Sequence, residues 1–142
     1  MITNYRGMLW VLIQESKKGT NFDPAKQEEK LYNLLNEKYS RDDIEMLLQE
    51  FTSIMNEYIG GKDFEKLHIS NGGVVNGADD TFYLDFASWL VGQGMILYQD
   101  YMNRGSKAVL EYIKRHKISR EQFEYECMMN AFFNYEDEIE EE

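Results

Sequence analysis

The polar residues on either side of a glycine-rich stretch are the ones best suited to chemistry. His68 precedes the stretch, and Asp79 and Asp80 follow it. A carboxylate that orients an imidazole gives a general base, and grouped carboxylates bind cations. Helix capping is the simpler interpretation of the two aspartates, because Asp is favoured where helices start. No nucleophile motif accompanies them, so we predict no catalytic residue and no metal site.

Two further polar features complete the candidate site. Asn71-Gly72-Gly73 offers backbone N–H groups to an anion, although its residue order matches neither the dinucleotide-binding fingerprint nor a phosphate-binding loop. Gln93 is expected to face the interior, where a structural bond to a backbone group is the simpler interpretation. The predicted ligand or partner site therefore comprises His68, Asn71, Asp79, Asp80 and Gln93, and no cofactor is predicted.

Helices are predicted to position these residues, because apolar side chains recur at spacings of three and four. Asp23 followed by Pro24 predicts a helix start, as does Ser40 before two aspartates. Ser119 begins a capping-box pattern, which predicts a last helix to about Tyr135.

One segment is expected to form the centre of the fold. The chain from Asp79 to Gly94 leaves almost no polar face, which predicts a helix over about 80–102 that is buried on several sides. Gly92 and Gly94 within it are expected to admit a neighbouring helix. The predicted fold class is all-α, a single compact domain of about five to six helices around this central helix.

Composition agrees with one soluble domain. The chain has 142 residues, 43% of them apolar, with one proline. We predict a helical domain over 1–135 and a disordered acidic tail over 136–142. The single cysteine, Cys127, fits a reducing cytoplasm, and the apolar run from Met8 to Ile13 is too short for a signal peptide or membrane span.

The charge of the chain bears on its partners. The net charge is −11, and the tail carries six of the acidic side chains. The only compact basic group, Lys114-Arg115-His116-Lys117, is more simply a favourable interaction with a helix C-terminus. We therefore predict no nucleic-acid binding and no membrane binding.

Three segments of the chain resemble a bacterial family of helical domains. Trp89-Leu90-Val91-Gly92-Gln93-Gly94, with Phe86 before it, is similar to the Trp-Leu-Ile-x-Gln-Gly core helix of the domain of unknown function 4240 family. Leu9-Trp10-x-Leu12-Ile13 is similar to the family's opening helix. Asn71-Gly72-Gly73 followed by Asp79-Asp80 extends the resemblance over most of the chain.

What this resemblance implies is limited. It implies an all-α fold and a cytoplasmic setting, and it transfers no catalytic residue because the family has no established activity. This chain also departs from the family at Ala87, where an arginine is often found.

Three functions remain open on the sequence alone. The first is a protein-binding module, such as an immunity or antitoxin-like protein that neutralises a basic partner by electrostatic attraction. The second is a small-ligand-binding protein or an enzyme that uses the 68–80 loop. The third is a nucleic-acid mimic, which requires ordered, regularly spaced acidic residues. The oligomeric state is not predicted.

Overall fold

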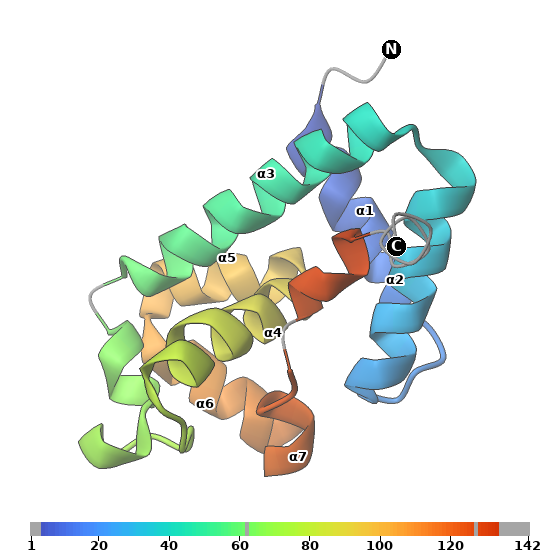
Figure 1. Cartoon of the computed structure of the whole chain (residues 1–142). Helices are drawn as coiled ribbons and strands as arrows, with labels where there is room; N and C mark the ends of the chain where they lie inside the picture. Colours follow the sequence, from blue (N-terminus) through green and yellow to red (C-terminus); the bar gives the residue numbers. More distant parts are fainter. Residues whose placement is uncertain (1–3, 62, 127, 134–142) are drawn as a thin grey trace.

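The computed structural model describes residues 4–61, 63–126 and 128–133, and its regular elements are helical (Figure 1). Within this part of the chain the only extended pairing is a single bridge between His68 and Val75. The predicted all-α fold is therefore confirmed. The elements in chain order are α1 (Tyr5–Lys17), α2 (Pro24–Lys38), α3 (Arg41–Ile59), η1 (Phe64–Leu67), η2 (Ile69–Asn71), the π-helical turn η3 (Thr81–Phe86), α4 (Ala87–Gly92), α5 (Met95–Arg104), α6 (Ser106–Arg115), α7 (Arg120–Phe123) and η4 (Met128–Phe132).

Helices α2 and α3 begin where the sequence predicts. Asp23 caps α2 by accepting hydrogen bonds from two backbone N–H groups of its first turn, and Pro24 occupies the first position of the helix. Ser40 caps α3 through the N–H of Asp43. Helix α1 packs against both α2 and α3. In Figure 1 the long α3 runs across the molecule, while α1 and α2 lie together at one end.

The buried centre is shorter than the sequence indicates. All six residues of α4 are buried, and the helix packs against α3, α5 and η4 (Figure 1). Instead of one helix over about 80–102, the helical run breaks at Gln93–Gly94 and continues as α5. Only Leu97 and Tyr101 are buried in α5, and Ile96 is 82% exposed. The second half of the expected central helix is therefore a surface helix.

Gly94 is the physical reason for the break. Its φ of +110° lies in a region that side chains make unfavourable, so a glycine is needed to redirect the chain there. We expected Gly94 to admit a neighbouring helix, and its conformation is the better explanation. A Cβ at Gly92 would lie 3.4 Å from Met128 Cγ, so Gly92 does stand in close contact with η4.

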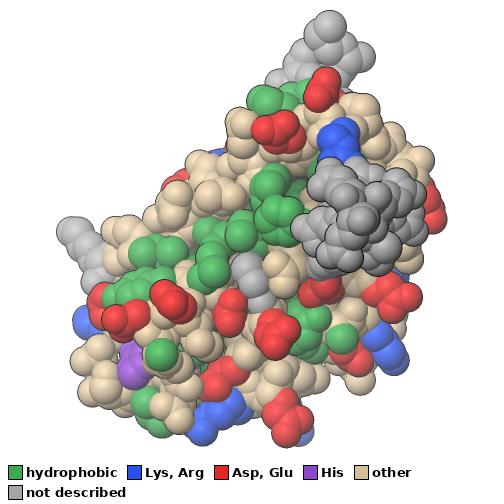
Figure 2. All heavy atoms as spheres, in the orientation of Figure 1, with side chains coloured by type: hydrophobic (Ala, Val, Ile, Leu, Met, Phe, Trp, Pro, Cys, Tyr) green, Lys and Arg blue, Asp and Glu red, His purple; other side chains and the backbone are tan. Residues whose placement is uncertain are grey.

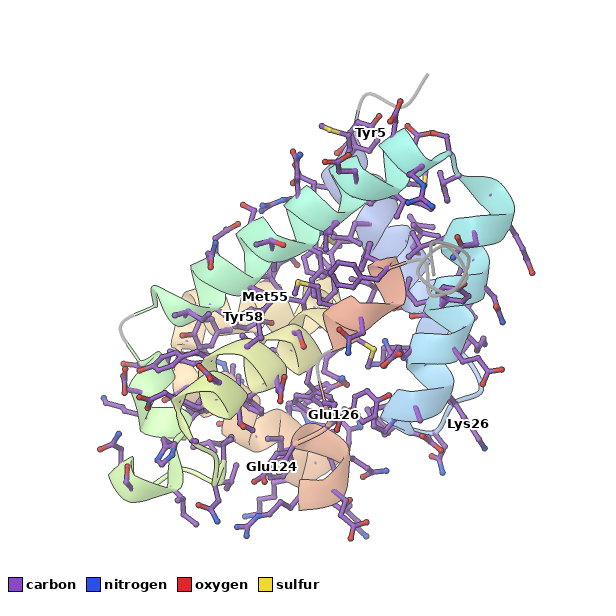
Figure 3. All side chains as sticks on the ribbon, viewed as in Figure 1. Tyr5, Lys26, Met55, Tyr58, Glu124 and Glu126 are labelled. Carbon is purple, nitrogen blue, oxygen red and sulfur yellow. The ribbon has the colours of Figure 1, made fainter. Side chains whose placement is uncertain are left out.

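Aromatic side chains connect the elements around α4. Phe86 stacks on Trp89 with 5.7 Å between ring centroids, and both rings lie edge-on to Phe123 of α7. Figure 3 shows Met55 and Tyr58 on the side of α3 that faces α4, and both are buried. Ser88 of α4 accepts a hydrogen bond of 2.9 Å from the backbone N–H of Met128, which fixes the start of η4.

The C-terminal part differs from the single helix that the sequence predicts. The capping box of Ser119 and Gln122 is present, but α7 ends at Phe123. Helical structure resumes at Met128 as η4, which packs against α2, α3 and α4. Cys127 and the predicted acidic tail over 136–142 lie outside the described residues.

Candidate functional site

His68 serves to hold its own loop together. Its Nδ1 accepts a hydrogen bond of 3.1 Å from the backbone N–H of Ser70, and its Nε2 lies 2.9 Å from the carbonyl oxygen of Gly77. This arrangement assigns the proton to Nε2, because a carbonyl can only accept. The ring also meets Phe82 edge-on at 5.0 Å. Both ring nitrogens are therefore engaged in closing the loop.

The other residues predicted near His68 do not converge on it. Asn71 donates a hydrogen bond of 2.9 Å to the backbone carbonyl of Glu65 in η1, the turn that precedes the loop. Asp79 and Asp80 are exposed in the first turn of the helical run that leads into α4, and Asp80 makes no side-chain capping bond. Within the described residues, no hydrogen bond joins His68 to either aspartate.

Gln93 lies at the other end of that helical run. A helix that rises 1.5 Å per residue places it about 20 Å from Asp80. Its Nε2 donates to the backbone carbonyl of Trp89 at 3.1 Å, and its Oε1 accepts from the hydroxyl of Tyr112 at 3.0 Å. The first of these is the backbone bond that we expected of a buried amide. The structure thus brings His68 and Asn71 together in one loop and places Gln93 in a separate region.

Side chains from α1 and α2 satisfy the carbonyl groups that the α4–α5 break leaves free. Gln27 Nε2 donates to the carbonyl of Gly92 at 2.6 Å, and Lys17 Nζ donates to the carbonyl of Gln93 at 3.0 Å. The last carbonyls of a helix have no partner within the helix, so these contacts replace a conventional C-cap. The break is consequently a fixed feature that ties together α1, α2, α4 and α6.

A groove of about 710 Å³ opens beside this break. Its wall is largely apolar, and three of its hydrophobic side chains are exposed: Val11 (57%), Met95 (44%) and Ile96 (82%). The groove lies between α1, α5 and the end of α6. It is lined by Gly7, Trp10, Val11, Gln14, Glu15, Lys17, Phe22, Gln93, Gly94, Met95, Ile96, Leu97, Asp100, Tyr112, Arg115 and His116.

Lys17 is the polar centre of the groove. Its ammonium donates to the carbonyl of Gln93 and, at 2.9 Å, to the hydroxyl of Tyr112. It also lies 5.1 Å from the ring centroid of Phe22 and 5.6 Å from that of Tyr112. Burial lowers the pKa of Lys17, because an apolar surrounding disfavours the charged form. Burial likewise raises the pKa of Tyr112 well above its ordinary value.

Strained backbone positions one wall of the groove. Phe22 has a φ of +63°, which is unfavourable for a bulky side chain. Its ring lies 5.0 Å from that of His116 and 6.2 Å from that of Tyr112. The pKa of His116 is lowered by burial and then by the positive charges of Arg115 and Lys17. Strain of this kind persists where the surrounding structure enforces it, and it is common at ligand sites.

A second polar feature is an acidic cluster near the start of α4. Burial raises the pKa of Asp85, and the negative charges of Glu126 and Asp80 raise it further. Figure 2 shows acidic side chains over the lower half of one face, below a band of hydrophobic side chains. In Figure 3, Glu124 and Glu126 lie on this same face, next to α7.

Most of the groove was missed on the sequence. Lys17-Lys18-Gly19 has the order of a basic last turn followed by glycine that is typical of a helix end, and Arg115 and His116 belong to the basic group interpreted as another helix end. Those interpretations describe the secondary structure correctly, because Lys17 closes α1 and Arg115 closes α6. Only Gln93 gave a signal, as a polar residue in an apolar segment. The pairing of these helix ends depends on tertiary contacts between residues 76 and 95 positions apart.

Comparison with protein-family models, curated proteins and solved structures finds no match to this chain. Among residues 4–61, 63–126 and 128–133, no three His, Cys, Asp or Glu side chains are grouped so as to hold a metal ion. None of the helices in these ranges combines the length and apolar character needed to cross a bilayer.

Proposed function

We propose that this protein is a binding protein that holds a small, mostly apolar molecule in the groove between α1, α5 and α6. The observation that carries the proposal is the exposure of Val11, Met95 and Ile96 on the rim of a hollow of about 710 Å³. Small-molecule sites have volumes of roughly 300–1,000 Å³ and combine apolar walls with a few placed polar groups. The groove matches this description in size and in composition.

The polar groups of the groove are already held in place. Lys17, Gln93 and Tyr112 are joined by hydrogen bonds of 2.9–3.0 Å, so a ligand meets them without prior rearrangement. Such preorganisation favours affinity, because the side-chain entropy is lost on folding and not on binding.

Binding of Nile red, an uncharged dye that fluoresces in apolar sites, tests this proposal. We expect saturable one-to-one binding to the wild-type protein and a loss of binding in Val11→Trp, whose indole would fill the groove. Met46→Trp is the matched control, because Met46 is 39% exposed on α3 and does not line the groove. Absence of saturable binding, or equal binding by the two variants, would contradict the proposal.

A second candidate function is capture of a basic protein by the acidic cluster, as an immunity or antitoxin-like protein would do. The observation that favours it is the repulsion of Asp85 by the negative charges of Glu126 and Asp80, since a cationic partner would relieve it. Co-purification from the native host at low salt tests this function. The same basic protein should be recovered with the wild type and not with the double variant Asp80→Asn, Asp85→Asn. Equal recovery with both would count against it.

A further inference from the structure

The groove is locally positive in a protein of net charge −11. Two cationic residues, Lys17 and Arg115, line it, together with His116, whose lowered pKa favours the neutral imidazole, and two acidic residues, Glu15 and Asp100. Glu15 is paired with Lys18 at 2.9 Å, and Asp100 is paired with Arg104 through two contacts of 2.7 Å. The acids of the groove are therefore neutralised by other residues, and the charge of Lys17 is left uncompensated.

The partners of Lys17 are all uncharged. Its ammonium meets a backbone carbonyl, a phenol oxygen and two aromatic rings, and within the described residues no carboxylate lies within 4.0 Å of it. Half-buried ammonium groups are normally paired with an anion, because desolvation of an isolated charge is unfavourable. An anion is therefore the ligand group best suited to the ammonium of Lys17.

The hydrogen-bond network leaves Lys17 free to receive that anion. An ammonium has three N–H donors, and two are used by Gln93 and Tyr112. The proton of the Tyr112 hydroxyl is directed to Gln93 Oε1, which keeps the phenol oxygen as an acceptor for Lys17. The third N–H of Lys17 remains for a ligand atom.

The apolar wall defines the remainder of the ligand. Trp10, Val11, Ile96 and Leu97 line the same groove and carry no charge. Of the two cations that line the groove, Arg115 is exposed and only Lys17 is half-buried. A single desolvated ammonium balances a single negative charge, whereas a phosphate dianion calls for several donors. A hydrocarbon group that ends in one carboxylate satisfies both requirements.

Building on the proposed function, we infer that the ligand is a small apolar carboxylic acid. Its carboxylate accepts a hydrogen bond from Lys17 Nζ, and its hydrocarbon part lies along Val11 and Ile96. Lys17 thereby determines which apolar molecules are retained. Neutral molecules of the same length bind through the apolar wall alone.

Decanoic acid and 1-decanol test this inference, because they share a chain and differ in the charged end. We would measure the Kd of each at pH 7.5 by displacement of Nile red from the wild type, Lys17→Met and Lys26→Met. Lys26 lies on α2, where Figure 3 labels it, and does not line the groove, so its variant controls for the loss of one positive charge. We expect the wild type and Lys26→Met to bind the acid at least about tenfold more tightly, which corresponds to one charge-assisted hydrogen bond. Lys17→Met should bind both molecules alike.

The outcomes separate the two proposals. Equal binding of acid and alcohol by the wild type, or a preference for the acid that survives in Lys17→Met, would overturn the inference and leave the groove as a site for apolar molecules. Failure of Nile red itself to bind would overturn the proposed function, and the inference with it.

Discussion

Lys17 Nζ donates a hydrogen bond of 3.0 Å to the backbone carbonyl of Gln93, which joins the end of α1 to the break between α4 and α5. The contact links residues that are 76 positions apart in the sequence. It supplies a partner to a helix-end carbonyl and at the same time holds an ammonium inside an apolar groove. One contact therefore contributes both to the fold and to the candidate site.

Replacement of Gly94 tests whether the break shapes the groove. Gly94→Ala places a Cβ at a φ of +110°, so we expect the free energy of unfolding to fall by about 1–2 kcal/mol and Nile red binding to weaken. Gly19→Ala is the control, because Gly19 also has a positive φ (+75°) but does not line the groove. Urea unfolding should show a loss of similar size in the control, with binding preserved. Equal binding by both variants would contradict this role of Gly94.

The pH dependence of stability tests the environment of Lys17. Burial lowers its folded-state pKa below the ordinary 10.5, so the unfolded chain binds this proton more tightly. The contribution of Lys17 to stability is therefore complete above pH 10.5 and is lost as pH falls through the folded-state pKa. Relative to Lys17→Met, the free energy of unfolding of the wild type should rise as the pH increases from neutral through the folded-state pKa toward 10.5. A difference that stays flat or falls over this range would indicate that the ammonium is paired in the folded state.

The sequence predicted the helices far better than it predicted their relation to one another. Caps at Asp23, Ser40 and Ser119 are local patterns, and each helix start appears where its pattern indicates. The apolar run across Gly94 has the same periodicity on both sides, so periodicity alone could not reveal the break. The break depends on φ at one glycine and on bonds from Lys17, Gln27 and Tyr112, which only the folded structure brings together.

The candidate site was predictable only in part, because the sequence indicated Gln93 but not Lys17. Gln93 was identified because a polar side chain in an apolar helix is conspicuous. His68 and Asn71 were identified by residue type, and the structure shows both engaged in hydrogen bonds to nearby backbone groups. Lys17 at a helix end looks like any other basic residue in that position. Its desolvation by Phe22 and Tyr112 is a tertiary property with no local signal.

Asp85 should weaken the folded state at neutral pH. Burial, then Glu126 and Asp80, raise its pKa above the ordinary 3.8, so its contribution to stability is complete below that pH and is lost as pH rises through the folded-state pKa. Asp85→Asn should therefore be more stable than the wild type at pH 7, with the advantage vanishing at about pH 3, below the ordinary pKa of 3.8.

Asp42→Asn is a control for the same change in net charge. Asp42 lies in the first turn of α3, where a negative charge interacts favourably with the helix dipole, so this variant should lose a few tenths of a kcal/mol. Thermal unfolding of both variants at the two pH values provides the measurement. Destabilisation by Asp85→Asn at pH 7 would show that this carboxylate has a favourable partner.

Tyr58 and Tyr101 form a matched pair in the core. The hydroxyl of Tyr58 is buried without a hydrogen-bond partner among the described residues, whereas that of Tyr101 donates to the backbone carbonyl of Tyr58 at 2.9 Å. We expect Tyr58→Phe to raise the free energy of unfolding by about 1 kcal/mol and Tyr101→Phe to lower it by about 1 kcal/mol. Denaturant titrations of the two variants measure this contrast. A loss of stability in Tyr58→Phe would point to a buried water on its hydroxyl.

The two tryptophans of the chain give the most direct test of the groove as the binding site. Trp10 lines the groove, whereas Trp89 lies in the core between Phe86 and Phe123. Their indole N–H groups give separate NMR signals, so a titration of ¹⁵N-labelled protein with decanoic acid reports on both positions at once. We predict a saturable shift of the Trp10 signal, with the Trp89 signal nearly unchanged. A titration that leaves Trp10 unchanged, or that moves both signals alike, would contradict binding in the groove.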